Sequence, residues 1–212
     1  MPIIKSVYVW QNLVRPKKRT FTYGFLSAGS VAQMQTDWWD FYRNSGTATW
    51  WREFTTNGLH NTYTWSTNKK GAVQKIHGLD FSTAKKIQIS VDHYLVSWSW
   101  NGASNFWITD NNGFSIYGNI YSENNSGYNW YGTGVTWSAE KWNRVSLSTG
   151  NYIGTLIIDL VNKTVTMKIS NRTDVVDSLS DSQIESIRNC TQARVFFDNV
   201  WNYYKDITVT WE

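Results

Sequence analysis

The 212-residue sequence has one cysteine and two prolines, and only 17% of its residues are charged. The single cysteine, Cys190, excludes a disulfide framework within a monomer, so stability must come from packing. No apolar run approaches the roughly 18 residues that a membrane-spanning helix needs. The N-terminus also lacks the apolar stretch and the cleavage site of a signal peptide. We therefore expect no membrane insertion and no signal-directed export.

Charge is too thinly spread to indicate a nucleic-acid-binding protein. The formal net charge is +4, and Lys and Arg are scattered apart from the segment RPKKR at 15–19. Because binding to nucleic acid needs a basic stripe, we expect no nucleic-acid partner. We interpret 15–19 as a solvated segment or as one that docks on another protein.

Aromatic residues are abundant, with 14 Trp, 12 Tyr and 9 Phe. Together with the few prolines, they favour strands over helices. From about residue 47, short strand patterns alternate with turns, among them Asn-Gly at 57–58 and 101–102 and Asn-Asn-Gly at 111–113. Such dipeptides supply the positive φ of tight hairpins. Ten to fourteen strands at this spacing predict an all-β sandwich or barrel.

The chain divides into two parts. Residues 1–25 read as an N-terminal docking arm or an edge strand, and residues 26–212 as one sandwich domain. A single segment of the domain has helical spacing. There, Ser180 is a candidate N-cap with Gln183 three residues later, which predicts one short helix at about 181–188.

Strand alternation sorts the rings of residues 98–132. If Phe106 and Ile108 face the core, then Trp107 faces outward, and the same alternation in the next strand places Tyr117 outward. These two rings are therefore expected on the outer or concave face of a sheet.

Other rings are assigned differently. Tyr94, Trp98 and Trp100 share one face of a strand, and because that face is large and apolar we expect it in the core. The segment GYNWYGTG at 127–134 has several glycines and no clean alternation, which indicates a loop with Tyr128, Trp130 and Tyr131 at its tip. In DWWDFY at 37–42, consecutive Trp38 and Trp39 cannot face one side, so one can meet a partner or the N-terminal segment.

Flat rings set among amides and hydroxyls suit a surface that binds sugar. The rings would stack on the apolar C–H face of a sugar, while Asn119, Asn125 and Asn129 bond its hydroxyl groups. Rigid aromatics give contact area at little entropic cost. The candidate ligand-binding residues are Trp107, Tyr117, Tyr128, Asn129, Trp130 and Tyr131. The alternative is that the same rings fill a protein–protein interface, where Trp and Tyr are also enriched.

Catalytic patterns are missing from the sequence. A retaining glycosidase needs two carboxylates about 5 Å apart, but the five glutamates show no suitable spacing and Asp80, Asp92 and Asp110 stand singly. The three histidines have no metalloprotease or Cys-partnered spacing, and we expect His93 to be a core or edge histidine. We expect no catalytic residue and no enzyme activity.

A metal site has one candidate residue, Asp110 in the segment TDNNG. Its carboxylate and the neighbouring amides of Asn111 and Asn112 offer the oxygen ligands that Ca²⁺ prefers. The favoured interpretation is a turn, in which Asp and Asn bond their own backbone. No cofactor is expected, and calcium is the one metal ion left open.

The C-terminal half resembles a known fold family. The order WNRVSLSTGNYIGTLIIDLVNKTVTMKIS, then LSDSQIESIRN, then ARVFFDN and KDITVTW, is similar to the concanavalin A-like or laminin-G-like jelly-roll family, over about residues 47–212. The resemblance implies an all-β, concanavalin A-like jelly-roll β-sandwich. Members of the family often bind calcium, and their β-glucan hydrolases carry an E-x-D-x-x-E strand that this sequence lacks.

The leader SVYVWQNLVRP resembles the N-terminal segments of bacteriophage structural proteins, which precede a binding module. This implies docking on other virion proteins through Val7, Tyr8, Trp10, Arg15, Lys17, Lys18 and Arg19. The two resemblances together imply a virion protein, made in the host cytoplasm, that binds host surface polysaccharide. Two alternative functions stay open, a purely structural decoration protein and a glycan hydrolase of the same fold. The formation of a homo-oligomer also stays open.

Overall fold

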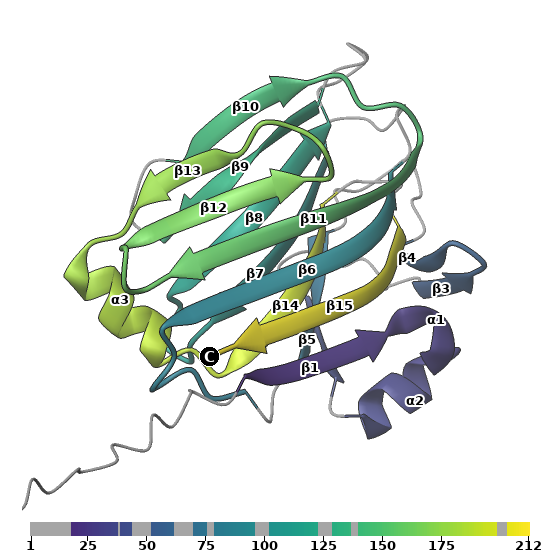
Figure 1. The fold of residues 1–212 in the computed structure, drawn as a ribbon. Coiled ribbons are helices and arrows are strands. Elements are labelled where there is room, and N and C mark those ends of the chain that lie inside the picture. The colour runs from purple at the N-terminus through teal and green to yellow at the C-terminus, as the bar shows by residue number, and fades with distance from the viewer. Residues whose placement is uncertain are drawn as a thin grey trace, which may run out of the picture.

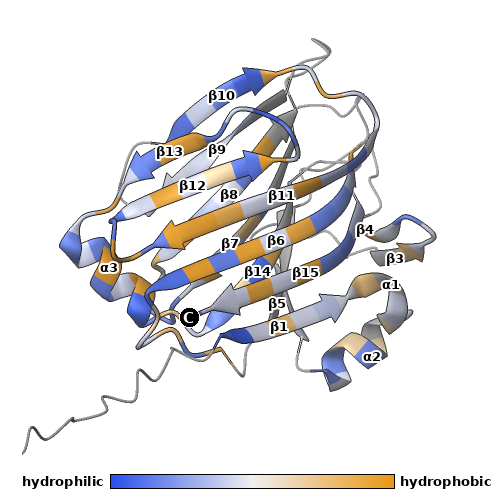
Figure 2. Cartoon of the chain, in the orientation of Figure 1, coloured by the Kyte–Doolittle hydropathy of each residue, from blue (hydrophilic) through white to orange (hydrophobic). Residues whose placement is uncertain are grey.

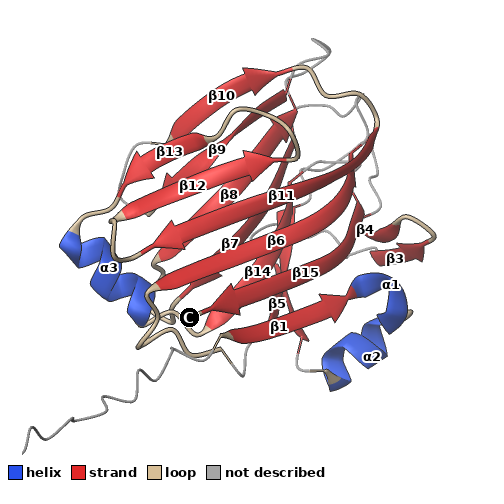
Figure 3. Ribbon diagram, in the orientation of Figure 1, coloured by secondary structure: helices blue, strands red, loops and turns tan. Residues whose placement is uncertain are grey.

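Two antiparallel β-sheets face each other and enclose the core (Figures 1 and 3). The computed structural model describes residues 18–37, 39–43, 52–61, 70–75, 79–95, 102–122, 129–136, 140–198 and 203–212. The predicted all-β, jelly-roll sandwich is confirmed. Trp98 and Trp100, predicted to be core residues, lie outside the described residues, as does Trp38.

Among the described residues, one sheet has eight strands and the other has seven. In spatial order, the strands of the larger sheet are β13 (Val175–Ser178), β12 (Thr164–Ile169), β11 (Gly150–Asp159), β6 (Lys86–Leu95), β15 (Tyr203–Trp211), β4 (Gly58–Asn61) and β3 (Arg52–Thr55). The eighth strand, β1 (Arg19–Gly24), pairs with β15 on the edge that β15 shares with β4. The C-terminal strand therefore lies inside this sheet.

The other sheet has seven strands. Its spatial order is β10 (Lys141–Val145), β9 (Asn129–Val135), β8 (Ser115–Ser122), β7 (Gly102–Thr109), β14 (Gln192–Asp198), β5 (Lys70–Lys75) and β2 (Trp39–Arg43). The hairpin that joins β7 to β8 turns at Gly113, whose φ of 90° is the positive value that the Asn-Asn-Gly sequence predicts.

Alternation along each strand builds the core. In β6, Ile87, Ile89 and Val91 are fully buried between the sheets, while the residues between them face outward (Figure 2). Glycines adjust the fit where a large ring must enter. A Cβ atom on Gly118 or on Gly154 would lie 2.9 Å from the ring of Phe106. The two glycines therefore leave room for that ring between the sheets.

The predicted helix is confirmed as α3 (Asp181–Arg188). Its N-cap, Ser180, accepts a hydrogen bond from the backbone of Gln183, and the Gln183 side chain bonds back to Ser180, which completes a capping box. The expectation of only one helix is wrong, because α1 (Phe25–Ala28) and α2 (Val31–Thr36) follow β1.

The start of the described chain packs into the sandwich. Trp39 is 2% exposed, and its ring centroid lies 5.0 Å from that of Tyr23 and 5.2 Å from that of Phe25. One of the two consecutive tryptophans therefore does contact the N-terminal segment. Residues 19–24 form an edge strand, and a docking role for the residues before them stays a prediction.

Two local predictions are wrong. The segment GYNWYGTG does not form the predicted loop, because 129–135 is strand β9. Leu95 is buried, so Tyr94 faces outward rather than into the core. Among the described residues, no helix is long and apolar enough to cross a membrane.

Candidate functional site

Trp107 and Tyr117 lie side by side on the outer face of the seven-stranded sheet. They are direct partners in the β7–β8 register, with ring centroids 6.2 Å apart and planes at 64°. Their strand neighbours Phe106, Ile108 and Ile116 are buried in the core. The predicted outward placement of both rings is confirmed, while their role in binding stays a prediction.

Two further residues extend this pair into a row across four strands. Arg194 of β14 is the register partner of Trp107, and its guanidinium carbon lies 5.6 Å from the ring centroid, which is a cation–π contact. On the other side, Gly134 of β9 is the partner of Tyr117. A Cβ atom on Gly134 would lie 2.1 Å from the Tyr117 ring, so the glycine lets that ring lie against β9.

The Tyr117 hydroxyl group donates a hydrogen bond to Oε1 of Glu140. Burial raises the pKa of Tyr117 above its ordinary value, and the bond to Glu140 and the charge of that carboxylate raise it further. The phenol therefore stays protonated at any physiological pH. Since its proton is held by Glu140, the ring is fixed in one orientation.

A second row contains the side chains of Asn105 and Asn119. The two residues face each other across β7 and β8, one outward position along from Trp107 and Tyr117. Asn119 is only 7% exposed. Both carbonyl oxygens are buried, and within the described residues neither has a hydrogen-bond partner. We name Asn105, Trp107, Tyr117, Asn119 and Arg194 the amide–aromatic face.

The candidates from GYNWYGTG are distributed differently. Tyr131 is 1% exposed and belongs to the core, where its hydroxyl group donates to the carbonyl oxygen of Thr173. Its expected position at a loop tip is therefore wrong, because it lies within β9 and alternates with the outer positions. Asn129 and Trp130 lie at the start of β9. Tyr128 and Asn125 lie outside the described residues.

Sequence reasoning missed Asn105 and Arg194. The signal for Asn105 was present, since it stands two residues before Trp107 and alternation puts both on one face. Arg194 carries no such signal. Its place follows from the pairing of β14 with β7, which are distant in the sequence.

One carboxylate pair was also missed. The sequence spacing predicts that Asp92 stands singly, but the β6–β15 register places Asp206 directly opposite it on the outer face of the eight-stranded sheet. Burial raises the pKa of Asp206, and the charge of Asp92 raises it further. The correction arises because strand pairing joins residues that no local spacing connects.

His93 and Cys190 are core residues. His93 is 1% exposed, and burial lowers its pKa from 6.5 to about 4, which confirms its expected place in the core. Cys190 is fully buried, and burial raises the pKa of its thiol. A nucleophilic thiolate needs a lowered pKa, so the Cys190 environment suits a structural role.

Asp110 closes the turn between β7 and β8. Its Oδ1 atom accepts hydrogen bonds from the backbone nitrogens of Asn112 and Phe114, both at 2.8 Å. These two bonds show that the segment TDNNG forms a turn, which is the interpretation favoured from the sequence. In the part of the chain that the structure describes, no group of three or more His, Cys, Asp and Glu residues could hold a metal ion.

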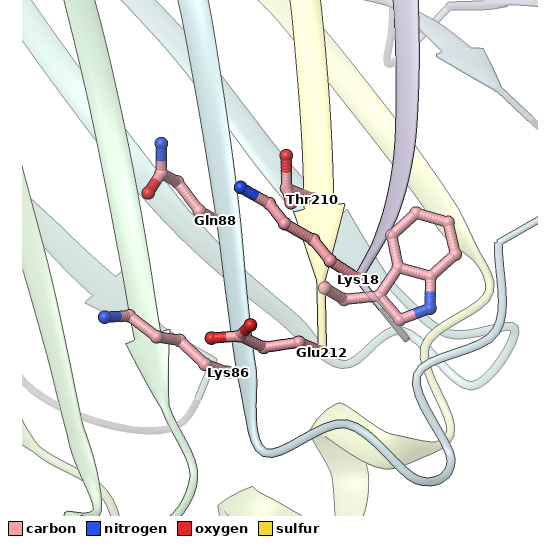
Figure 4. A pocket seen from close by; sticks show the side chains of 6 residues that line it. Lys18, Lys86, Gln88, Thr210 and Glu212 are labelled. Atoms are coloured by element: carbon pink, nitrogen blue, oxygen red, sulfur yellow. The ribbon is translucent and has the colours of Figure 1, made fainter. Parts of the chain in front are cut away.

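Two of the predicted docking residues are described. Lys18 lines a shallow pocket of about 180 Å³ with Lys86, Gln88, Thr210, Trp211 and Glu212, where the ends of β1, β6 and β15 meet (Figure 4). Arg19 forms an exposed ion pair with Asp80 at 3.5 Å. Exposed pairs of this kind contribute little stability. Val7, Tyr8, Trp10, Arg15 and Lys17 lie outside the described residues.

Solved structures of similar fold include phage and plant proteins. The CBM2 module of the evolved Dit of Lactobacillus casei BL23 phage J-1 has a TM-score of 0.68 at 8% identity, covering 92% of this chain and 97% of that chain. A carbohydrate esterase from the Shiga toxin-encoding bacteriophage phi24B has a TM-score of 0.61 at 11% identity, covering 92% and 100%. The lectin of Bauhinia forficata, solved with GalNAc, has a TM-score of 0.60 at 12% identity, covering 92% and 99%.

No protein-family model matches the sequence, and no curated protein matches it. These three structural matches are 8–12% identical to this chain, so they establish the fold alone. That fold is a concanavalin A-like jelly roll of the legume-lectin type, as the sequence resemblance implied.

Proposed function

We propose that this chain is a bacteriophage structural protein whose jelly-roll domain binds glycan on the host cell surface without cleaving it. The observation that carries the proposal is the Trp107–Tyr117 pair, two partly exposed rings held on the outer face of a sheet. Rigid rings beside amides suit a sugar, because the rings contact its C–H face while the amides bond its hydroxyl groups. The similarity to a module of a phage Dit supports a place on a virion.

Binding without cleavage is supported by the state of the described candidates for catalysis. His93 lies in the core with its Nδ1 atom 3.2 Å from the carbonyl oxygen of Val91, and Cys190 is buried. The Asp92–Asp206 pair lies on the other sheet, away from the amide–aromatic face. Residues 1–25 would attach the domain to other virion proteins.

The test is a screen of the purified, folded chain against an array of host-type oligosaccharides, with and without calcium. We expect retention of specific glycans and no release of reducing ends. Loss of retention in chelator would place a metal near the site. Absence of any retention would contradict the proposal and favour a structural decoration protein, whose rings seal subunit contacts.

Release of reducing ends or of ester groups would contradict the non-catalytic part of the proposal. The similarity to a phage carbohydrate esterase makes this assay necessary. The variants Asp92→Asn and Asp206→Asn would then show whether the facing carboxylates perform the cleavage.

A further inference from the structure

The amide–aromatic face contains two buried acceptors that the fold itself does not use. Asn105 and Asn119 are direct partners across β7 and β8, and the Cβ atoms of such partners lie about 5 Å apart. Their Oδ1 atoms are both buried, and among the described residues neither accepts a hydrogen bond. An acceptor that loses its hydrogen bond to water on burial, and gains no other donor, destabilises the folded state.

A purely structural role does not account for the pair. An apolar side chain of similar size would fill either position without leaving an orphaned oxygen, and replacing both members of a polar pair by apolar groups of the same shape can be nearly neutral or stabilising. Several of the other buried polar atoms without partners in the described chain, such as Nε1 of Trp39 and Nε1 of Trp211, belong to residues of the core. Asn105 and Asn119 instead alternate with core residues, on the same face as Trp107 and Tyr117.

The chemistry of the missing partner follows from the two atoms. An amide oxygen needs a donor, and sugar hydroxyl groups are donors. The terminal torsion of an Asn side chain is broad and soft, so each oxygen can turn toward a ligand without a backbone change. Carboxylate and sulfate groups have no proton to donate, so neither amide oxygen could accept a hydrogen bond from them.

We infer that Asn105 and Asn119 supply the hydrogen-bond acceptors of a subsite for a neutral pyranose residue. Two hydroxyl groups of the sugar donate to the two amide oxygens, and its C–H face contacts the partly exposed rings of Trp107 and Tyr117. The inference rests on the proposed function and names the class of ligand, a neutral rather than an acidic sugar.

The test uses concentration series of the full chain on one array. The array carries oligosaccharides that end in glucose, galactose or N-acetylgalactosamine, beside uronic-acid and sulfated ones. The variants are Asn105→Leu, Asn119→Leu and Asn119→Ala, the last without added bulk. The matched control is Asn151→Leu, because Asn151 is an exposed Asn of the other sheet whose Oδ1 accepts from Nζ of Lys205 at 2.7 Å.

We expect the wild type to bind neutral glycans, with at least a tenfold loss of affinity in each of the three variants and none in the control. The unfolding temperature of Asn119→Leu should be equal to or above that of the wild type. Unchanged binding in the three variants, or a preference for acidic glycans, would overturn the inference and leave the proposed function standing. Absence of any binding by the folded wild type would refute the proposed function itself.

Discussion

In the part of the chain that the structure describes, each outer face of the sandwich carries a cross-strand aromatic pair, and the two pairs have nearly the same geometry. Trp107 and Tyr117 lie 6.2 Å apart at 64°, and Tyr94 and Tyr203 of the eight-stranded sheet lie 6.0 Å apart at 68°. Their surroundings differ. The tyrosine pair stands next to the facing carboxylates of Asp92 and Asp206. The other pair contacts one cation, Arg194, and one carboxylate, Glu140, and stands next to two neutral amides.

The polar groups on the two faces also differ in how they are satisfied. On the eight-stranded sheet, hydroxyl groups bond each other across strands, Thr22 with Thr208 and Ser90 with Thr155, each at 3.2 Å. On the seven-stranded sheet, the oxygens of Asn105 and Asn119 have no such partner in the described structure. Ring geometry alone does not distinguish the two faces, whereas the unmet hydrogen-bonding capacity beside the rings does.

The largest expected effect is on the free energy of unfolding and comes from His93, which is buried in the core. It sets the pH range in which the two faces can be compared. His93 has a pKa of about 4 in the folded protein against 6.5 for the free side chain. The unfolded chain therefore binds the extra proton first, and stability that is complete above pH 6.5 falls as pH drops toward 4, by about 3 kcal/mol. Urea unfolding at several pH values measures this loss. A free energy of unfolding that is flat from pH 6.5 to 4 would contradict the assignment.

Removing one aromatic side chain from each outer face distinguishes the two faces most clearly. Trp107→Ala removes the stacking ring and the contact of Arg194, and we expect a loss of glycan affinity of about 30-fold, or 2 kcal/mol, as for a central interface aromatic. Tyr94→Ala is the matched control on the other face and should keep the wild-type affinity. Array titrations of both variants measure the difference, and equal losses would contradict the distinction between faces.

A smaller effect is expected from moving a ring without removing it. Gly134→Ala adds a Cβ atom 2.1 Å from the Tyr117 ring, which must swing away from Glu140. We expect a loss of affinity of about 5-fold, or 1 kcal/mol. In Gly150→Ala the nearest atom would be 4.0 Å away, so this control should bind normally. The account fails here if Gly134→Ala also binds normally while a crystal structure shows the ring displaced.

The smallest effect is expected on the satisfied face. Thr208→Val removes the hydroxyl group that bonds Thr22, and the cost should be about 0.5–1 kcal/mol of unfolding free energy with no change in glycan binding. Thermal unfolding and the array together measure both quantities. Weaker glycan binding by Thr208→Val would indicate that the glycan contacts the eight-stranded sheet, and this would contradict our account.

Much of this architecture could be predicted from local patterns. The period-two alternation of β6, β7 and β8 and the capping box at Ser180 are visible in the sequence. Strand β9 was missed because its glycines read as a loop signal, whereas Gly134 is small to admit a ring from the neighbouring strand. The helix α2 was missed because it is short, although Ser30 caps it.

The candidate site could be predicted only in part, because some of its residues are brought together by pairing between strands that are distant in the sequence. Trp107 and Tyr117 follow from alternation within one hairpin. Arg194 and the Asp92–Asp206 pair depend on the register between strands that are far apart in the chain. No composition or spacing encodes that register, which is set by the packing of the whole core.

The most direct test is a ¹H–¹⁵N NMR titration of the uniformly labelled chain with the neutral oligosaccharide that the array retains best. The account predicts that resonance shifts concentrate on the indole N–H of Trp107, on the side-chain amides of Asn105 and Asn119 and on the backbone of β7 and β8. Shifts that concentrate instead around Tyr94 and Tyr203, with the amide–aromatic face unchanged, would contradict it.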